Sequence, residues 1–406
     1  MKILVTGSNG FVGKNLVWNL REIQGGKNKT RPDISIDDIM EYDTDTPFSE
    51  LESACKEADF VFHFAGVNRP QNKEEFKKQN SCFTNSLLGL LKKSNNMCPI
   101  MLASSIQACL EGRYANSEYG LSKLDAEKAV FEYAEEVGSK VYVYRFPNLF
   151  GKWCRPNYNS VVATFCNAIA NDREYIVNDK NTELELLYID DLIEGMLDVL
   201  VGKERRCNYD GTIPVESELG KYCFVPRTHK VTLSHIVELL QKFKNASHSI
   251  HVPSLPNDSF EKKLYSTFLT YLPKEDWSHR LDMKTDDRGS FTELIKTKAS
   301  GQVSVNITKP GITKGEHWHN SKNEIFIVVS GHGLIRERKI GTNPENGKEY
   351  PIIEFEVSGE QMQAIKMIPG YPHSITNISD TEELITVMWA NEQFETNKPD
   401  TFYEPL

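Results

Sequence analysis

The chain has 406 residues, with 47 basic and 57 acidic side chains and a formal net charge of −10. At roughly 150 residues per domain, this length predicts two or three domains. Hydrophobic residues make up 39 % and charged residues 26 %, a balance typical of folded rather than disordered chains. The acidic excess argues against nucleic acid as a partner, because such binding relies on Lys and Arg that neutralise phosphates.

The sequence carries no sign of membrane insertion or secretion. No stretch approaches the roughly 20 apolar residues that span a bilayer, and the first residues lack the apolar region and cleavage site of a signal peptide. The eight cysteines are scattered without a CxxC pair, which disfavours disulfide frameworks and zinc ribbons. We therefore expect a cytoplasmic protein with buried free thiols and no membrane partner.

A glycine-rich turn opens the chain. Residues 2–6 are predicted to form a buried parallel strand and residues 14–20 a helix, with a GxxGxxG pattern between them. A bare backbone lets a pyrophosphate approach, and the helix N-terminus offers free N–H groups and a positive dipole end. The alternative is a purely structural turn. The residues assigned to a dinucleotide cofactor on this basis are Gly7, Asn9, Gly10, Phe11, Val12 and Gly13.

Two further strands contribute to the predicted cofactor site. The strand at 38–42 ends at Asp43, whose carboxylate would accept hydrogen bonds from an adenosine ribose and repel a 2′-phosphate. Asp43 is equally explained as an ordinary loop carboxylate. The strand within 58–66 ends in Ala65 and Gly66, and these small residues would let a cofactor lie across the sheet edge.

The remaining pattern predicts two domains. Further strands are expected at 99–103 and 140–144, with helices at 82–93 and 122–136. This β/α alternation predicts a doubly wound parallel sheet of the Rossmann type. From Leu281 onward, short strands separated by glycines predict an all-β sandwich or barrel. We place the domains at 1–275 and 276–406.

Tyr119 and Lys123 form a YxxxK motif that follows a predicted strand ending in Ser104 and Ser105. In a helix the two side chains lie on one face. A nearby ammonium would lower the pKa of the phenol, so that it exchanges a proton near neutral pH. A serine hydroxyl could hydrogen-bond the carbonyl or alcohol of a substrate. The alternative is an unrelated surface pair.

A second cluster comprises His317, His319, Glu324 and His373. His317 and His319 would face the same way in a strand, and Glu324 is expected on the return strand of a hairpin. Three imidazoles and a carboxylate suit Zn, Fe, Mn or Ni, with a position left open for water or substrate. The alternative is a set of unconnected core and surface histidines.

Residues 1 to about 270 resemble an extended short-chain dehydrogenase/reductase acting on nucleotide sugars, on the segments 6–13, 63–66, 104–105, 119–123, 145–151 and 188–191. The resemblance implies Tyr119 as general acid, Lys123 as the partner that lowers its pKa and also binds the cofactor, and Ser105 as the hydroxyl that orients the carbonyl, with Ser104 as the alternative. It also implies that the segment after Arg145 lines the sugar-nucleotide site. The diphosphate candidates are Arg145, Lys152 and Arg155, any of which could instead be salt-bridged, and Asn148 is a further candidate for the substrate site.

The C-terminal part resembles a cupin, a metal-binding jelly roll. Its second motif departs from the family pattern because Pro369 and Gly370 are adjacent. Residues 285–293 are similar to the opening segment of cupin-class deoxysugar 3,5-epimerases, which makes Arg288 a candidate ligand of a substrate diphosphate. An Arg–Asp turn pair is the alternative.

As a whole, the chain resembles CapF-type capsular polysaccharide synthesis enzymes. The resemblance implies that the cupin epimerises C3 of a UDP-2-acetamido-2,6-dideoxy-4-hexulose, and that the reductase domain then reduces the C4 ketone. The product would be UDP-N-acetyl-6-deoxy-L-talosamine, for polysaccharides that contain L-fucosamine. It also implies NADPH (Asp43 would allow NADH), a divalent metal with zinc as first choice, and a homodimer.

Two questions stay open at this point. Lys322, Tyr371 and His332 are candidate acid/base groups for the epimerisation, and nothing in the sequence chooses among them. The first alternative function is a sugar-nucleotide 4-epimerase or dehydratase that recycles NAD, with the cupin as a structural dimerisation module. The second is a nucleotide-sensing regulator without catalysis, against which the intact Tyr119 and Lys123 argue.

Overall fold

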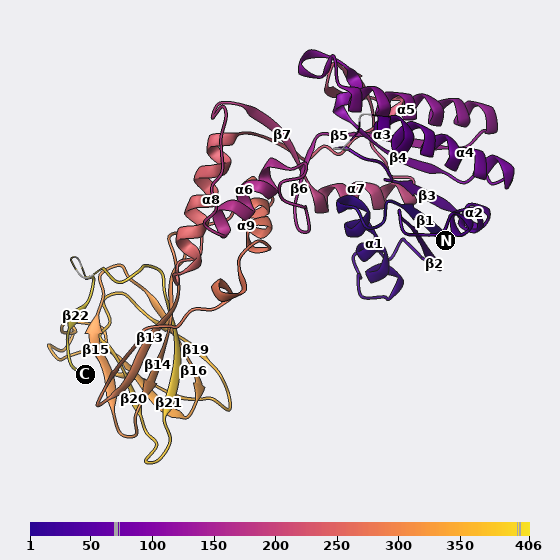
Figure 1. Ribbon diagram of the computed structural model, residues 1–406. Coiled ribbons are helices and arrows are strands. Elements are labelled where there is room, and N and C mark those ends of the chain that lie inside the picture. Colours follow the sequence, from indigo (N-terminus) through magenta and orange to yellow (C-terminus); the bar gives the residue numbers. More distant parts are fainter. Residues whose placement is uncertain (69–71, 73, 396, 398) are drawn as a thin grey trace. The chain divides into compact units, whose positions relative to one another are not determined.

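The computed structural model describes residues 1–68, 72, 74–395, 397 and 399–406. The chain forms two compact units, one of residues 1–240 with 258–272 and one of 241–257 with 273–406 (Figure 1). Within the described part of the chain, each helix is too short or too polar to span a bilayer.

The first unit alternates strands and helices. Its elements are β1 (Lys2–Thr6), α1 (Phe11–Gln24), β2 (Asp38–Tyr42), α2 (Phe48–Glu57), β3 (Phe60–His63), α3 (Glu74–Phe76), a π-helical turn (Lys77–Cys82), α4 (Phe83–Lys93), β4 (Ile100–Ser105), α5 (Glu118–Val137), β5 (Val141–Phe146), β6 (Asn148–Phe150), α6 (Val161–Ala170), β7 (Glu183–Tyr188), α7 (Ile189–Leu200), β8 (Arg206–Asp210), β9 (Ile213–Glu216), β10 (Tyr222–Cys223), β11 (Thr228–Thr232), α8 (Leu233–Ser247) and α9 (Phe260–Leu269). Short 3₁₀ turns follow β4 at 106–109 and 112–114.

The large sheet of this unit has the strand order β2-β1-β3-β4-β5-β10-β8-β9. The strands from β2 to β10 are parallel, and β8 and β9 join antiparallel at the edge. Strand β2 pairs with one edge of β1, whereas β3 pairs with its other edge. The direction in which successive strands are added to the sheet therefore reverses between β1 and β3. Ligands bind in such sheets at the carboxyl ends of the strands beside this reversal.

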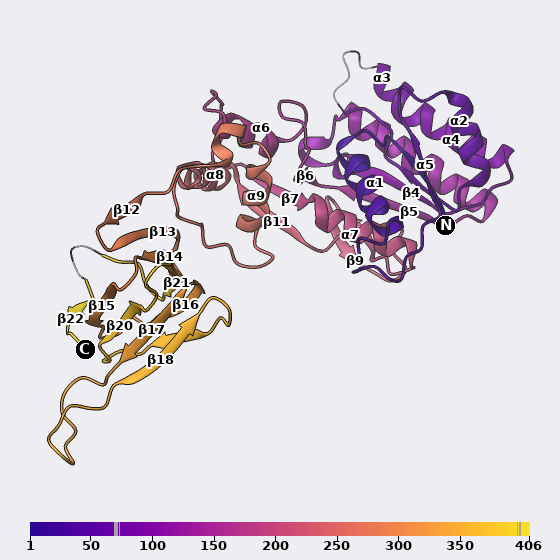
Figure 2. The same ribbon diagram turned by 90° about the horizontal axis from the view of Figure 1, so that it is seen from below.

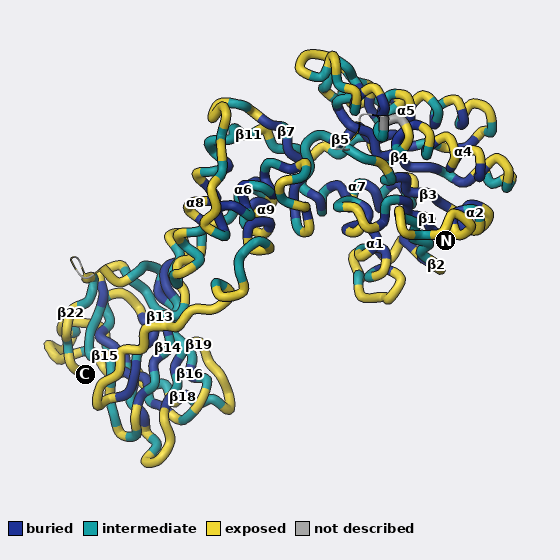
Figure 3. Tube along the Cα trace, viewed as in Figure 1, coloured by how far each residue is buried: buried dark blue, intermediate teal, exposed yellow. Residues whose placement is uncertain are grey.

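Helices cover both faces of this sheet, as the first two figures show. Ile3 and Val5 pack into a core with α1 and α7, whereas Leu4 packs into a second core with α2, α4 and α5. Because β1 is buried on both faces, it reads as a continuous apolar run rather than an alternating one. The buried strands between exposed helix surfaces are visible in Figure 3. The expected Rossmann-type α/β parallel sheet is confirmed.

Helix α5 begins earlier than the sequence predicted. Ser117 caps it, since its hydroxyl accepts a hydrogen bond of 2.9 Å from the backbone N–H of Gly120. Gly138 ends it in a left-handed conformation with φ of 75°. Tyr119 and Lys123 therefore lie in the first two turns of a regular helix, on one face.

A buried ion pair ties α5 to β5. Arg145 donates from Nε to Glu127 Oε1 at 2.9 Å and from Nη2 to Glu127 Oε2 at 2.7 Å. The two side chains are only 7 % and 1 % exposed. The guanidinium also stacks on Tyr222, 4.3 Å from the ring centroid. The pair thus connects α5, β5 and β10 in a region shielded from water.

The second unit is built from antiparallel strands. Its elements are a 3₁₀ turn (Lys274–Trp277), β12 (Met283–Asp286), β13 (Gly289–Thr297), β14 (Gly301–Thr308), β15 (Thr313–Trp318), β16 (Glu324–Ser330), β17 (His332–Glu337), β18 (Ile353–Ser358), β19 (Ala364–Met367), β20 (His373–Asn377), β21 (Leu384–Ala390) and β22 (Phe402–Tyr403). One sheet has the order β12-β13-β14-β21-β16-β19 and the other β18-β17-β20-β15-β22. The expected β-rich C-terminal region is confirmed.

Both sheets contribute to the apolar core of this unit, for example Phe326 and Leu384 from the six-stranded sheet and Ile335 and Ile375 from the other. Strands β15 and β16 belong to different sheets, so the expected hairpin between them is wrong. Residues 319–323 instead cross from one sheet to the other.

Strand β14 contributes a polar row to the otherwise apolar inner face of the six-stranded sheet. Thr386 of β21 pairs with Val328, a core residue, so its side chain is on the inner face. Asn306 pairs with Thr386 from the other side, and alternate residues of β14 continue the buried polar row. The members of this row are Gln302, Ser304, Asn306, Thr308 and Thr386. Three of their side-chain oxygens, on Gln302, Thr308 and Thr386, have no hydrogen-bond partner. The opposite face is apolar and half-exposed, with Val303, Val305, Ile307, Ile385 and Val387.

Replacing Glu127 by Ala should destabilise the first unit strongly, because the Arg145 guanidinium would remain buried without its partner. Loss of one member of a buried pair costs about 3–5 kcal/mol. The matched control is Glu136→Ala on the same helix, which breaks an exposed pair with Lys92 and should cost at most about 1 kcal/mol. Urea unfolding followed by circular dichroism would measure both, and equal shifts would refute a stabilising role for the buried pair.

Candidate active sites

The glycine-rich turn leaves the backbone bare at the point where the strand order reverses. Gly7 has a φ of 72°, and a Cβ placed on it would lie 2.7 Å from the backbone nitrogen of Ala65. A Cβ on Gly13 would lie 2.1 Å from the carbonyl oxygen of Gly7. Helix α1 has neither a side-chain cap nor an acidic residue in its first turn, so its free N–H groups suit an anion. These observations fit a dinucleotide pyrophosphate.

A cavity of about 530 Å³ adjoins this turn. Its volume falls in the range usual for small-molecule sites. The predicted site residues that line it are Gly7, Asn9, Gly10, Phe11, Val12, Gly13, Gly66, Ser104, Ser105, Tyr119, Lys123, Asn148 and Arg155. The structure thus brings the turn, the YxxxK motif and two substrate candidates to one place.

Asp43 and Ala65 lie beside the cavity residues rather than among them. Asp43 follows β2, and its Oδ2 accepts a hydrogen bond of 2.8 Å from the backbone N–H of Asn9. Ala65 follows β3, and its backbone nitrogen is the atom that leaves no room for a side chain at Gly7. Both residues therefore hold the turn in place.

Ser105, Tyr119 and Lys123 converge in the cavity. Lys123 is buried, and its ammonium donates to the carbonyl oxygen of Ala103 at 2.9 Å. Burial lowers the pKa of Lys123 to about 8, which still leaves most of the ammonium protonated at neutral pH. Ser105 lines the cavity together with Tyr119, and its hydroxyl lies close enough to lower the pKa of the tyrosine. Ser104 instead donates to Glu127, so Ser105 is the serine on the tyrosine side.

The expected lowering of the Tyr119 pKa is wrong for this structure. Burial raises the pKa of Tyr119 to about 12, Tyr158 adds to the rise, and the Ser105 hydroxyl only opposes it. The Lys123 ammonium lies 5.9 Å from the centroid of the tyrosine ring. Desolvation therefore outweighs the charge, and the phenol stays protonated, ready to donate.

Asn80 is a residue of this site that the sequence analysis missed. Its amide nitrogen donates to Ser122 Oγ at 2.8 Å and to the carbonyl of Val67 at 3.0 Å, while its oxygen accepts from the N–H of Val67 at 2.8 Å. It lies in the π-helical turn, a feature often found at functional sites. Asn80 fixes the chain next to Gly66, where a Cβ would lie 3.4 Å from Lys123 Nζ.

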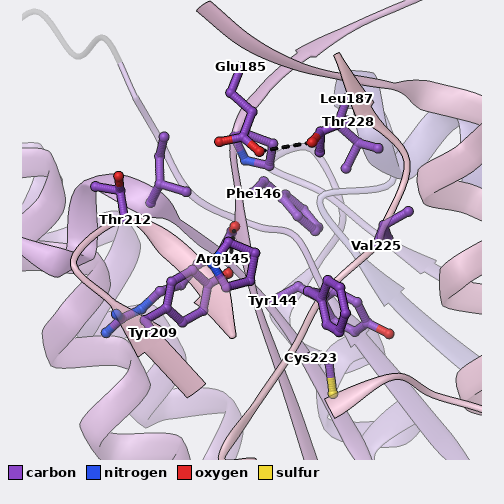
Figure 4. Close-up of a pocket in the computed structure, with 14 residues that line it drawn as sticks. Tyr144, Arg145, Phe146, Glu185, Leu187, Tyr209, Thr212, Cys223, Val225 and Thr228 are labelled. Carbon is purple, nitrogen blue, oxygen red and sulfur yellow. Dashed lines mark hydrogen bonds between the residues drawn. The ribbon is translucent and has the colours of Figure 1, made fainter. Parts of the chain in front are cut away.

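The structure withdraws Arg145 from the substrate candidates. Its guanidinium is committed to Glu127, with a further contact to Cys109 Sγ at 3.2 Å. It borders a separate cavity, shown in Figure 4, beside Tyr209 and Thr212. That cavity measures about 30 Å³, which is room for one or two waters but not for a sugar nucleotide.

The other cationic candidates differ in their contacts. Arg155 lines the large cavity and stacks on Tyr158, 5.5 Å from the ring centroid. Lys152 is paired with Asp190. Arg288 donates to Asp286 from Nε at 3.0 Å and from Nη2 at 2.7 Å, so the structure shows the Arg–Asp turn pair. Arg155 keeps the position best suited to a substrate anion.

The second cluster assembles in the second unit. The ligand atoms of His317, His319, Glu324 and His373 all lie within 4.8 Å of one another. His317 is directly opposite His373 in the register of β15 and β20. A bulge between Gly315 and His317, with Glu316 at φ of 57°, sets this alignment. Glu324 reaches the cluster from the other sheet.

The charges of the cluster suit a divalent cation. Burial alone would raise the pKa of Glu324, but His319, His373 and the ammonium of Lys322 hold it well below its usual range. Burial and the neighbouring imidazoles lower the pKa of His317 to about 4, so this ring is neutral. His373 Nε2 is buried without a hydrogen-bond partner. Imidazole nitrogens and a carboxylate are ligands that fit zinc and related metals.

Backbone carbonyls orient two of the imidazoles. His319 Nδ1 is hydrogen-bonded to the carbonyl oxygen of Asp400, and His373 Nδ1 to that of Tyr371 at 3.2 Å. Both contacts direct Nε2 towards the cluster. The Asp400 carboxylate in turn accepts backbone N–H groups of residues 320, 321 and 322 at 2.9, 2.8 and 3.0 Å. Asp400 was missed by the sequence analysis, since no local pattern marks it.

The structure separates the acid/base candidates of this unit. Lys322 Nζ lies 2.7 Å from Glu324 Oε1, whereas Tyr371 contacts His373 through its backbone carbonyl rather than its phenol. His332 is exposed at the far end of β17 from Glu337, which is the residue opposite His373. Five strand steps place it about 16 Å away from that end, so His332 is withdrawn. Glu337 is buried, and burial raises the pKa of its carboxyl.

Comparison with known proteins identifies both parts of the chain. Residues 3–208 match the NAD dependent epimerase/dehydratase family, and residues 284–402 match the polysaccharide biosynthesis C-terminal domain. The chain is 36 % identical over 402 residues to a UDP-2-acetamido-2,6-beta-L-arabino-hexul-4-ose reductase of Pseudomonas aeruginosa, covering 99 % of this chain and 98 % of that protein. It is 25 % identical over 231 residues to a dTDP-4-dehydro-6-deoxyglucose reductase of Escherichia coli, covering 48 % of this chain and 71 % of that protein.

A solved structure resembles the chain along its whole length. The capsular polysaccharide assembling protein CapF of Staphylococcus aureus is 45 % identical, with a TM-score of 0.83 and 100 % of both chains covered. The chain therefore belongs to the NAD dependent epimerase/dehydratase family, as a CapF-type member that carries a polysaccharide biosynthesis C-terminal domain.

Proposed function

We propose that this chain is a bifunctional nucleotide-sugar enzyme. Its C-terminal unit epimerises C3 of a UDP-2-acetamido-2,6-dideoxy-4-hexulose, and its N-terminal unit reduces the C4 ketone with NADPH to UDP-N-acetyl-6-deoxy-L-talosamine, for capsular polysaccharide. The observation that carries the proposal is the presence of two different chemical centres in one chain, Ser105-Tyr119-Lys123 and the His₃Glu cluster. The names of the Pseudomonas and Staphylococcus relatives support the substrate and the pathway class.

In the reductase centre, the bare backbone at Gly7, Gly10 and Gly13 would hold the pyrophosphate of the cofactor, with Asn9, Phe11, Val12, Asp43, Ala65, Gly66 and Lys123 around it. NADPH, when bound, supplies the reducing equivalent. Tyr119 donates the proton to the C4 oxygen, because burial keeps its phenol protonated. Ser105 orients the carbonyl, and the buried Lys123 ammonium stabilises negative charge that develops beside it.

We assign the epimerase to residues 276–406 as a cupin jelly roll and the reductase to 1–275. Zinc is the first choice of metal, held by His317, His319, Glu324 and His373, and it would polarise a bound ketone. A C4 ketone acidifies the proton on C3, so a base must remove it and an acid return it on the other face. The candidates are Lys322, whose ammonium is paired with Glu324; Glu337, which lies opposite His373; and Tyr371, two residues before His373.

The outer face of the six-stranded sheet supports a homodimer. The apolar outer face is of the kind that a second copy of the chain would cover.

The test is incubation with the 4-keto sugar nucleotide in deuterated water, with and without NADPH. The proposal expects deuterium at C3 without cofactor and oxidation of NADPH when it is added. An NAD-recycling 4-epimerase or dehydratase with a structural cupin would instead give no exchange at C3 and no net oxidation of cofactor.

Replacing Tyr119 by Phe should slow ketone reduction by roughly 10²–10⁴-fold, because the proton donor is lost. Exchange at C3 should be unchanged, since that reaction uses the other centre. Absorbance of NADPH and mass spectrometry of the sugar measure the two steps, with Tyr350→Phe as a control outside both centres. Equal loss of both steps would contradict the division of labour.

Replacing His373 by Ala should reduce bound metal to a small fraction of one equivalent and abolish exchange at C3. The matched control is His332→Ala, which removes an exposed histidine of the same unit and should keep the metal. Elemental analysis of the purified proteins gives the metal content. Full metal in both variants would exclude His373 as a ligand.

Replacing Asp400 by Ala should weaken metal binding by roughly 10–100-fold, the usual cost of losing a group that orients a ligand. The carboxylate holds the backbone of residues 320–322, and with it the carbonyl that fixes His319. Competition with a chromophoric chelator measures the affinity, and Asp380→Ala, an exposed acid of the same unit, is the control. Indistinguishable affinities would show that Asp400 has no positioning role.

A further inference from the structure

A second groove lies beside the glycine-rich turn. It measures about 470 Å³ and is lined by Ser8, Asn9, Lys14, Val17, Trp18, Arg21 and Glu41. Asn9 and Lys14 line this groove and the 530 Å³ cavity alike. A ligand whose pyrophosphate lies on the turn therefore meets the groove across these two residues. The groove is bounded by α1 on one side and by the end of β2 on the other, where the adenosine ribose lies in this fold.

The groove carries more positive than negative charge. Lys14 makes no ion pair among the described residues, and its ammonium lies 5.2 Å from the ring centroid of Trp153. Arg21 stacks on Trp18, 5.3 Å from the centroid, and is paired with Glu41. Two cations thus face one carboxylate, and the Lys14 charge is available to an incoming anion.

Asp43 does not cancel this charge. Its Oδ2 accepts the N–H of Asn9 at 2.8 Å, and its Oδ1 accepts the N–H of Thr44 at 2.8 Å and the Thr44 hydroxyl at 3.3 Å. These donors hold the carboxylate in the turn, and Asp43 is not among the residues that line the groove. The charges that a 2′-phosphate would meet in the groove are therefore those of Lys14, Arg21 and Glu41.

We propose that Lys14 and Arg21 select a cofactor whose adenosine ribose carries a 2′-phosphate. This inference rests on the proposed reductase and names the residues that would choose NADPH over NADH. Lys14 contacts the phosphate directly. Arg21 turns to it from Glu41, which is the carboxylate that holds this guanidinium while no phosphate is bound. Glu41 thus competes with the phosphate for Arg21.

The test is calorimetric titration of the intact chain with ADP-ribose and with 2′-phospho-ADP-ribose, in one buffer of fixed ionic strength. Neither probe carries nicotinamide, so binding is measured without turnover. We expect the phosphorylated probe to bind the unmodified chain at least about tenfold more tightly, as charge-assisted hydrogen bonds to a phosphate require. Lys14→Gln and Arg21→Gln should each lose about fivefold or more of this preference, measured as the ratio of the affinities for the two probes.

Two further variants sharpen the test. Glu41→Gln should increase the preference for the phosphorylated probe, because Arg21 is released from its competitor. Lys27→Gln, which removes an exposed lysine paired with Glu22 just beyond α1, should change neither affinity. Equal affinities of the unmodified chain for the two probes would overturn the inference and leave the reductase standing. Failure of both probes to bind would overturn the reductase assignment itself.

Discussion

The proposed reductase centre depends on a close approach of backbone segments that only glycine permits. The turn after β1 passes so near the end of β3 that a Cβ on Gly7 would lie 2.7 Å from Ala65, and the first turn of α1 packs on Gly7 so tightly that Gly13 has no room for a side chain. Gly66 faces Asn80 under the same restriction, with a Cβ contact of 2.5 Å. This packing aims the free N–H groups of α1 at one point and sets Lys123 beside Gly66. A larger residue at any of the three positions would separate the anion site from the proton donor.

The second unit meets a different constraint, which is to hold three imidazoles and a carboxylate together inside a β structure. The four candidate ligands come from both sheets. Backbone carbonyls hydrogen-bond Nδ1 of His319 and of His373 and so orient these two rings. Asp400 contributes to this arrangement in two ways. Its carboxylate accepts backbone N–H groups of the segment between the sheets, and its carbonyl oxygen orients His319.

What the sequence predicted well was local. The glycine turn, the YxxxK pair on one helix face and the His-x-His spacing each depend on residues a few positions apart, and the structure assembles all three. Long-range partners escaped it. No sequence pattern near Arg145 predicts that Glu127 and Tyr222 are its partners. Asp400 lies 81 positions from His319 in the chain, so no local pattern links the two. The hairpin at Glu324 was wrong because spacing alone does not distinguish a turn within one sheet from a crossing between two. The Tyr119 pKa was wrong because burial, which the sequence does not show, outweighs a neighbouring charge.

The central claim is that one chain holds two independent centres acting in succession on one sugar. The most direct measurement mixes two variants, Tyr119→Phe and His373→Ala, and follows the stereochemistry of the sugar product by NMR with NADPH present. Each variant alone should fail to make the talosamine product, and the mixture should make it, because the epimerised ketone can pass from one protein to the other. Formation of that product by either variant alone would contradict the account.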